Sequence, residues 1–233
     1  MKEKIKIIGV PETMIQTLYA RAKETKKSDA KIRDEIAVEI VEKLDYDFTK
    51  ADKDSTMANG VIARTIVLDG MVNDYLNTHS DTIVVNIGCG MDTRCYRMQG
   101  KYKLWYNVDL PETINIRKRF LAENGPIYQI AKSAMDTSYT DDITYNGENV
   151  LVIMEGLSMY LQEKDIRRIF SIIENAFNKS TIQVLDLYVY NIGMTGRSLS
   201  LATAIGILKS IVSVTLLAIV NFVSKKTRGE SMI

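Results

Sequence analysis

Apolar residues along this chain recur at helical spacing in its first part and in short continuous runs after that. Up to about residue 80 they fall three or four positions apart, the period of an amphipathic helix. Beyond that point helical patterns alternate with short apolar runs, which we read as strands at Thr82–Ile87, Leu104–Val108, Ile127–Ala131, Asn149–Met154 and Thr181–Val189. Alternating strands and helices predict an α/β fold, a doubly wound, Rossmann-like parallel sheet with right-handed crossovers.

The helical part has recognisable starting residues. Residues 11–27 place Pro11 in the first turn, Ser28 or Asp29 is positioned to cap a second helix that runs to Leu44, and a third helical stretch covers roughly 57–77. A further helix is predicted from Pro111 to near Gly125, and another opens at Gln162.

These patterns divide the chain into three parts. Residues 1–80 are predicted to form a helical lid over the ligand, 81–190 a ligand-binding α/β core, and 191–233 an atypical apolar C-terminal segment.

A glycine-rich turn follows the first predicted strand, and an acidic residue ends the second. The turn reads Gly88-Cys89-Gly90-Met91-Asp92-Thr93-Arg94, and the acid is Asp109. Open α/β sheets bind ligands at the carboxyl ends of their strands, and an acid about 20 residues downstream can accept hydrogen bonds from ribose hydroxyls. Because Thr93 stands where a dinucleotide fingerprint needs a third glycine, the pattern favours a nucleoside ligand without phosphate. S-adenosylmethionine is the common ligand of this kind.

Three predicted strands end in acids, namely Asp109, Asp136 and Glu155. Since parallel strands direct their carboxyl ends to one edge of a sheet, we expect these carboxylates to surround a single cleft. Each acid could instead cap a helix or form a turn.

Composition narrows the classes of partner. The chain has 233 residues and a net charge of +1, which gives no reason to expect nucleic acid. Cys89 and Cys95 lack further ligands for a metal site, and we expect them to be reduced thiols in a cytoplasmic protein. The one histidine, His79, precedes the first strand, so we expect it at a helix end or the surface and expect no histidine general base.

The motifs together resemble a known family. The glycine-rich turn, Asn107-Val108-Asp109-Leu110-Pro111-Glu112 and Glu155-Gly156-Leu157-Ser158-Met159-Tyr160-Leu161 are similar to motifs of the leucine carboxyl methyltransferase family, in particular its bacterial branch. The resemblance covers roughly residues 8–190. It implies an S-adenosylmethionine-dependent O-methyltransferase acting on a hydroxyl or carboxyl group of a small molecule.

The resemblance also implies roles for individual residues. The turn containing Gly88 and Gly90 would pass under the methionine part of the cofactor. Asp109, with Leu110 beside it, would bind the ribose, and Asp136 would accept from the adenine amino group. Glu155 would lie beside the methyl or ammonium group, and Arg64 would pair with the cofactor carboxylate.

Further candidates surround these residues. Arg21 and Lys23 are candidates for the same carboxylate region, whereas Arg94 is expected to brace the turn against Asp92 or Asp109. If catalysis uses a base, the candidates are Glu155 and Tyr160. Tyr160 and Met159 either line the acceptor pocket or belong to the core.

The C-terminal segment departs from the family, whose sheet normally gains a final antiparallel strand pair. Residues 201–223 are mostly apolar and lack hairpin residues, so we predict mainly helix there. Three interpretations stay open: an apolar helix packed partly on the domain, membrane association through 199–228, or a disrupted reading frame. The alternatives to an active methyltransferase are a cofactor-binding but catalytically impaired paralogue, a membrane-attached protein and a nicotinamide-dependent oxidoreductase.

Overall fold

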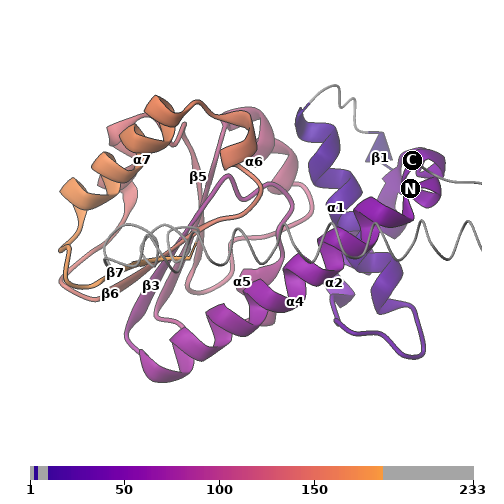
Figure 1. Cartoon of the computed structure of the whole chain (residues 1–233), viewed down its shortest axis with the longest axis horizontal. Coiled ribbons are helices and arrows are strands. Elements are labelled where there is room, and N and C mark those ends of the chain that lie inside the picture. The colour runs from indigo at the N-terminus through magenta and orange to yellow at the C-terminus, as the bar shows by residue number, and fades with distance from the viewer. Residues whose placement is uncertain (1–2, 5–9, 186–233) are drawn as a thin grey trace, which may run out of the picture. The chain divides into compact units, whose positions relative to one another are not determined.

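A computed structural model describes residues 3–4 and 10–185 of the chain (Figure 1). Its contacts divide the chain into a unit of Met1–Leu185 and a second unit of Asp186–Ile233, and the description below concerns the first. The predictions for 191–233, including the helix at 201–223 and the membrane segment at 199–228, lie outside the described residues. Within the described part of the chain, no helix is both long and apolar enough to cross a bilayer.

The centre of the described unit is a five-stranded sheet in which every neighbouring pair is parallel. The strands are β3 (Thr82–Ile87), β4 (Leu104–Asp109), β5 (Ile127–Ala131), β6 (Asn149–Met154) and β7 (Ile182–Val184), in the order β5-β4-β3-β6-β7. This is the doubly wound topology predicted from the sequence. The strand order reverses between β3 and β6, and such a switch point is where open α/β sheets place their ligands.

Strand register aligns the predicted site residues. Ile87 at the end of β3 pairs with Val108 on one side and with Met154 on the other. The residues that directly follow these three positions are Gly88, Asp109 and Glu155. The parallel sheet therefore brings the glycine-rich turn and two of the three predicted acids to one edge.

Helices cover both faces of the sheet. Before the sheet come β1 (Glu3–Lys4), α1 (Val10–Thr25), α2 (Glu35–Lys43), β2 (Leu44–Asp45), α3 (Thr49–Lys53) and α4 (Ser55–Thr78), with β1 parallel to β2. Along the sheet follow α5 (Arg94–Arg97), α6 (Pro111–Arg117), the 3₁₀ turns η1 (Thr137–Asp142) and η2 (Ser158–Tyr160), and α7 (Glu163–Ala176).

One face of the sheet packs against α4 and α5. Val72 and Leu76 of α4 and Cys95 of α5 form one buried cluster with residues such as Val84 and Trp105 of the sheet. Side chains alternate across a strand, so Tyr106 faces the other way. Its hydroxyl accepts a 3.1 Å bond from the backbone of Thr144, just after η1, which places η1 on the opposite face.

The N-terminal helices reach the glycine-rich turn. Ile15 and Leu18 of α1 pack with Ile40 of α2 in a second buried cluster, and this cluster includes Met91 of the turn. Figure 1 shows α4 extending from the sheet toward these helices. The predicted lid residues thus contact the ligand edge of the core, while their function as a lid stays a prediction.

Three predicted boundaries were wrong or only partly described. Asp34, rather than Ser28 or Asp29, caps α2, because its side chain accepts a bond from the backbone of Ala37 at 3.1 Å. Helix α6 ends at Arg117, far short of the predicted end, because the chain turns there through bonds from Phe120 and Leu121 to the Arg117 carbonyl. Strand β7 ends at Val184, and the predicted strand residues from 186 lie outside the described part.

Candidate functional site

The glycine-rich turn leaves β3 with two residues in the left-handed region. Gly88 has φ of 68° and Gly90 has φ of 47°, conformations that cost a residue with a side chain strain energy. The Gly88 backbone donates a 2.8 Å bond to the carbonyl of Val108, so the turn is tied to the end of β4. A Cβ atom on Gly88 would lie 3.1 Å from the side chain of Leu157. The glycine therefore permits both the turn and this close approach.

Asp109 connects the end of β4 to the same turn. One carboxylate oxygen accepts a 2.8 Å bond from the backbone of Gly90, and the other accepts a 2.7 Å bond from the backbone of Leu110. Burial raises the pKa of Asp109 above its ordinary value, against the effect of these backbone donors. The carboxylate thus occupies a fixed position beside the glycine turn.

Glu155 follows β6 and binds two arginines from different elements. Its Oε1 accepts a 2.7 Å bond from Nε of Arg64 on α4, and its Oε2 accepts a 2.8 Å bond from Nη2 of Arg94 on α5. The Arg64 side chain is 41% exposed, the Glu155 side chain 16% and the Arg94 side chain 1%. The Arg64 guanidinium also lies over Gly156, where a Cβ would be 3.6 Å from its Nη1.

Behind Glu155 lies a cluster of buried ion pairs. Arg94 binds Asp69 at 2.6 Å and Asp92 at 2.7 Å, and Arg97 also binds Asp69, at 3.0 Å. Burial would raise the pKa of Asp92, but the guanidinium groups of Arg94 and Arg97 outweigh it and hold the pKa well below its usual range. The Asp92 carboxylate is therefore ionised at neutral pH.

The cluster continues to the N-terminal helices through Asp34. This carboxylate accepts bonds from Arg21 at 2.9 Å, from Arg97 at 3.1 Å and from the hydroxyl of Thr93. Arg21 also donates a 2.8 Å bond to the carbonyl of Met91. These bonds fix α1 and α2 to the glycine-rich turn.

Sequence reasoning missed much of this cluster, in particular Asp34, Asp69, Arg97 and Arg117. Arg117 is completely buried and donates to the carbonyls of Gly90 and Asp92 at 3.0 and 2.6 Å, so it stabilises the turn. The available sequence signal was the three-residue spacing of Arg94 and Arg97, which places both on one face of α5.

Three of the predicted candidates have polar partners of their own. Asp136 is exposed and caps η1 by accepting a 2.9 Å bond from the backbone of Ser138. Lys23 forms an exposed pair with Asp52, and Arg21 belongs to the buried cluster just described.

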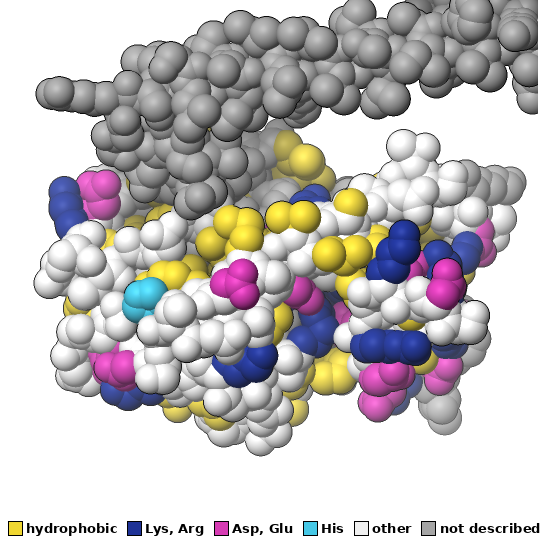
Figure 2. Space-filling model, turned by 60° about the horizontal axis from the view of Figure 1, so that its bottom comes forward, with side chains coloured by type: hydrophobic (Ala, Val, Ile, Leu, Met, Phe, Trp, Pro, Cys, Tyr) yellow, Lys and Arg dark blue, Asp and Glu magenta, His cyan; other side chains and the backbone are white. Residues whose placement is uncertain are grey.

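Other expectations can be compared directly with the structure. Arg94 braces the turn through Asp92, as one of the two alternatives proposed. His79 caps the end of α4, stacks on Tyr75 and is visible as the cyan side chain in Figure 2. Met159 and Tyr160 are 71% and 49% exposed, so they do not belong to the core. Cys89 and Cys95 are free and buried.

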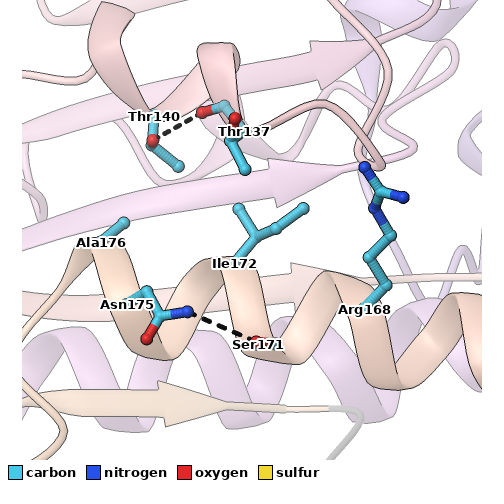
Figure 3. Close-up of a pocket in the computed structure, with 7 residues that line it drawn as sticks. All are labelled: Thr137, Thr140, Arg168, Ser171, Ile172, Asn175 and Ala176. Atoms are coloured by element: carbon cyan, nitrogen blue, oxygen red, sulfur yellow. Dashed lines mark hydrogen bonds between the residues drawn. The ribbon is translucent and has the colours of Figure 1, made fainter.

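Neither Asp109 nor Glu155 lines either of the two clearest pockets among the described residues. A cavity of about 400 Å³ lies between η1 and α7, as Figure 3 shows, and is lined by Thr137, Thr140, Arg168, Ser171, Ile172, Asn175 and Ala176. The first of these lining residues, Thr137, directly follows Asp136 in the sequence. At the glycine turn, by contrast, Leu157 covers Gly88 and Arg64 covers Gly156. Side chains of the chain itself therefore lie close to these two glycines.

Comparisons with known proteins find that this chain is similar to methyltransferases. The model of the leucine carboxyl methyltransferase family matches residues 14–174. The tetracenomycin polyketide synthesis O-methyltransferase TcmP of Streptomyces glaucescens is 32% identical over 166 residues, covering 71% of this chain and 61% of that protein. The S-adenosyl-L-methionine-dependent methyltransferase dpfgK of Gibberella zeae is 28% identical, covering 78% of this chain and 66% of that protein.

The chain thus spans less than two thirds of the length of these curated relatives. Among solved structures, a putative methyltransferase from Thermobifida fusca is similar, with 14% identity, a TM-score of 0.48 and coverage of 71% of this chain and 64% of that one.

Proposed function

The chain belongs to the leucine carboxyl methyltransferase family, and from this premise we propose that it binds S-adenosylmethionine and transfers the methyl group to a hydroxyl or carboxyl oxygen of a small molecule. The observation that carries the proposal is the meeting of three motifs at the switch point of the sheet. The glycine-rich turn, Asp109 and Glu155 come from separate parts of the sequence and end at neighbouring strand positions.

The residues at this edge fit such a cofactor. Gly88 and Gly156 have no side chains, so the backbone can approach a ligand as closely as it now approaches Leu157 and Arg64. Asp109 offers a carboxylate suited to a pair of ribose hydroxyls. Arg64 and Glu155 offer opposite charges suited to the carboxylate and ammonium of an amino acid.

Each residue has a separate task in this proposal. Arg64 exchanges its contact with Glu155 for the ligand carboxylate, and Glu155 then accepts from the ligand ammonium. Asp109 and the neighbouring Leu110 hold the ribose, and Asp136 accepts from the adenine amino group. Each contact fixes the ligand relative to the sheet, so that the reacting atoms are aligned.

Alignment is the main catalytic contribution that we propose. When bound, S-adenosylmethionine supplies an activated methyl group on a sulfonium, and placing an oxygen in line with it is catalysis by proximity. Glu155, paired with two guanidinium groups, is better suited to binding a cation than to removing a proton. A carboxylate acceptor needs no base, and for a hydroxyl acceptor Tyr160 is the candidate to take the proton. The exposed Tyr160 ring and the exposed Met159 side chain are available to line the acceptor pocket.

Calorimetry on the full chain tests the first half of the proposal. S-adenosylhomocysteine should bind and NAD should not, whereas the reverse result would favour a nicotinamide-dependent oxidoreductase. Mass spectrometry of phenols and carboxylic acids incubated with the chain and S-adenosylmethionine tests the second half. Binding without any methyl transfer would indicate a catalytically impaired paralogue.

A conservative change at Arg64 gives a residue-level prediction. Arg64→Lys should weaken the binding of S-adenosylhomocysteine about tenfold, because a lysine cannot offer the planar pair of donors that matches a carboxylate. Calorimetry measures the effect. Arg167→Lys is the matched control, since Arg167 pairs with Glu163 on the exposed face of α7. Equal affinity of Arg64→Lys and the wild type would remove Arg64 from the site.

A further inference from the structure

Arg94 is buried and binds carboxylates from three separate elements. Its Nε donates to Asp69 of α4, its Nη1 to Asp92 of the glycine-rich turn and its Nη2 to Glu155 after β6, at 2.6, 2.7 and 2.8 Å. Its backbone N–H also donates to Asp92. All three nitrogens of the guanidinium group are therefore used, and each contact joins Arg94 to a different part of the proposed site.

Glu155 has two arginine contacts of very different character. The Arg94 side chain is 1% exposed, while the Arg64 side chain is 41% exposed and its one described ion pair is with Glu155. Separating Arg94 from Glu155 would leave the buried Nη2 of Arg94 without its acceptor, which is unfavourable. Arg64 can turn to water or to a ligand at little cost, because a surface ion pair contributes little.

We propose that Arg94 is a positioning residue that keeps the Glu155 carboxylate in place while Arg64 leaves it for the ligand. This inference rests on the proposed function, in which Glu155 receives the ammonium of the cofactor. Arg94 holds Oε2, so Oε1 remains the oxygen that changes partner. The carboxylate then keeps its orientation during the exchange, so ligand binding loses no conformational entropy in reorienting it.

The contact with Asp69 extends the role of Arg94 to Arg64. Both residues belong to α4, and five positions separate them, a little more than one helical turn. The Asp69–Arg94 pair fixes this part of α4 against the turn. Arg94 therefore positions the part of α4 that carries Arg64 as well as Glu155, the carboxylate partner of Arg64.

Two ligands distinguish positioning from a general structural role. S-adenosylhomocysteine carries the amino-acid part, whereas methylthioadenosine has the adenosine and the sulfur but no ammonium or carboxylate. In Arg94→Gln we expect the affinity for S-adenosylhomocysteine to fall about tenfold or more, the effect of losing support for one charge-assisted hydrogen bond. The affinity for methylthioadenosine should stay within about twofold of the wild type, because no charged contact is lost.

Arg97→Gln is the matched control. Arg97 belongs to the same helix and cluster and shares Asp69 with Arg94, but its described partners are Asp34, Asp69, Asp92 and Thr93 and do not include Glu155. We expect this variant to lower thermal stability without a selective loss of S-adenosylhomocysteine. Arg94→Lys keeps a cation in the cluster and should show a smaller selective loss than Arg94→Gln. If Arg94→Gln does not fold, the comparison with Arg97→Gln is made on Arg94→Lys.

The outcomes separate the two proposals. If the wild-type chain does not bind S-adenosylhomocysteine, the proposed function is wrong. If the wild type binds it but the Arg94 variants lose both ligands equally, or lose no more than Arg97→Gln, Arg94 is structural and the inference is overturned. A selective loss that lysine partly restores supports the positioning role.

Discussion

Asp34→Ala is expected to lower the free energy of unfolding by about 3–5 kcal/mol, the cost of breaking a buried ion pair from one side. The Asp34 carboxylate is buried and accepts bonds from Arg21, Arg97, Thr93 and the backbone of Ala37. Its removal leaves the buried guanidinium of Arg21 and the partly buried one of Arg97 each short of a partner, and takes the N-cap from α2. Urea unfolding followed by circular dichroism measures the change.

Asp52→Ala serves as the control for Asp34. Asp52 also pairs with a residue of α1, Lys23, but both side chains are about half exposed. Its loss should change stability far less, because exposed pairs are screened by water. Similar losses in the two variants would show that the buried cluster contributes no more than the surface.

Asp34 also gives the sign of one pH effect. Burial would raise the pKa of Asp34, but Arg21, Arg97 and its hydrogen bonds hold that pKa below the ordinary value. A lowered folded-state pKa contributes stability above the unfolded pKa, about 3.9 for aspartate, and loses it as the pH falls through the folded value. Below pH 4 the wild type should therefore lose more stability than Asp34→Asn.

The second large effect is expected on ligand binding. Asp109→Ala should weaken the binding of S-adenosylhomocysteine by about 2 kcal/mol or more, near thirtyfold, because a partly buried carboxylate that binds two hydroxyls makes charge-assisted bonds. Calorimetry on the folded variant measures this change. The variant also frees the backbone donors of Gly90 and Leu110, so affinity alone does not locate the effect.

A deoxyribose analogue shows whether the affinity lost in Asp109→Ala comes from the contact with the ribose hydroxyls. The wild type should bind 2′-deoxy-S-adenosylhomocysteine more weakly than the ribose form, and Asp109→Ala should no longer distinguish the two. A variant that keeps the full preference for ribose would place the hydroxyls somewhere other than at Asp109.

The sheet and its ligand edge were predictable because their signals are local. Strands β3, β5 and β6 have the predicted bounds, since continuous apolar runs between turn residues define buried parallel strands. The positions of Gly88, Asp109 and Glu155 then follow from the parallel register. The expectation that Asp136 ends a strand was wrong, because β5 ends at Ala131, five residues earlier, and the Asp136 side chain caps η1.

The buried ion pairs were not predictable in the same way. Asp69 lies 25 residues from Arg94, and Asp34 lies 63 residues from Arg97, so no short spacing connects the partners. The cap of α2 shows the same limit. Ser28, Asp29 and Asp34 are all suitable capping residues, and only Asp34 has Arg21 and Thr93 within reach in the fold.

The pairing of Arg64 with Glu155 bears on how the site meets its ligand in solution. The two side chains neutralise each other, and the amino-acid part proposed to replace their contact is itself a neutral zwitterion. A site of this kind exerts little long-range attraction, in contrast to a basic phosphate-binding loop. Dissolved salt screens the broken pair and the new contacts alike. Encounter would then depend on diffusion and local fit, and the site would work over a wide range of ionic strength.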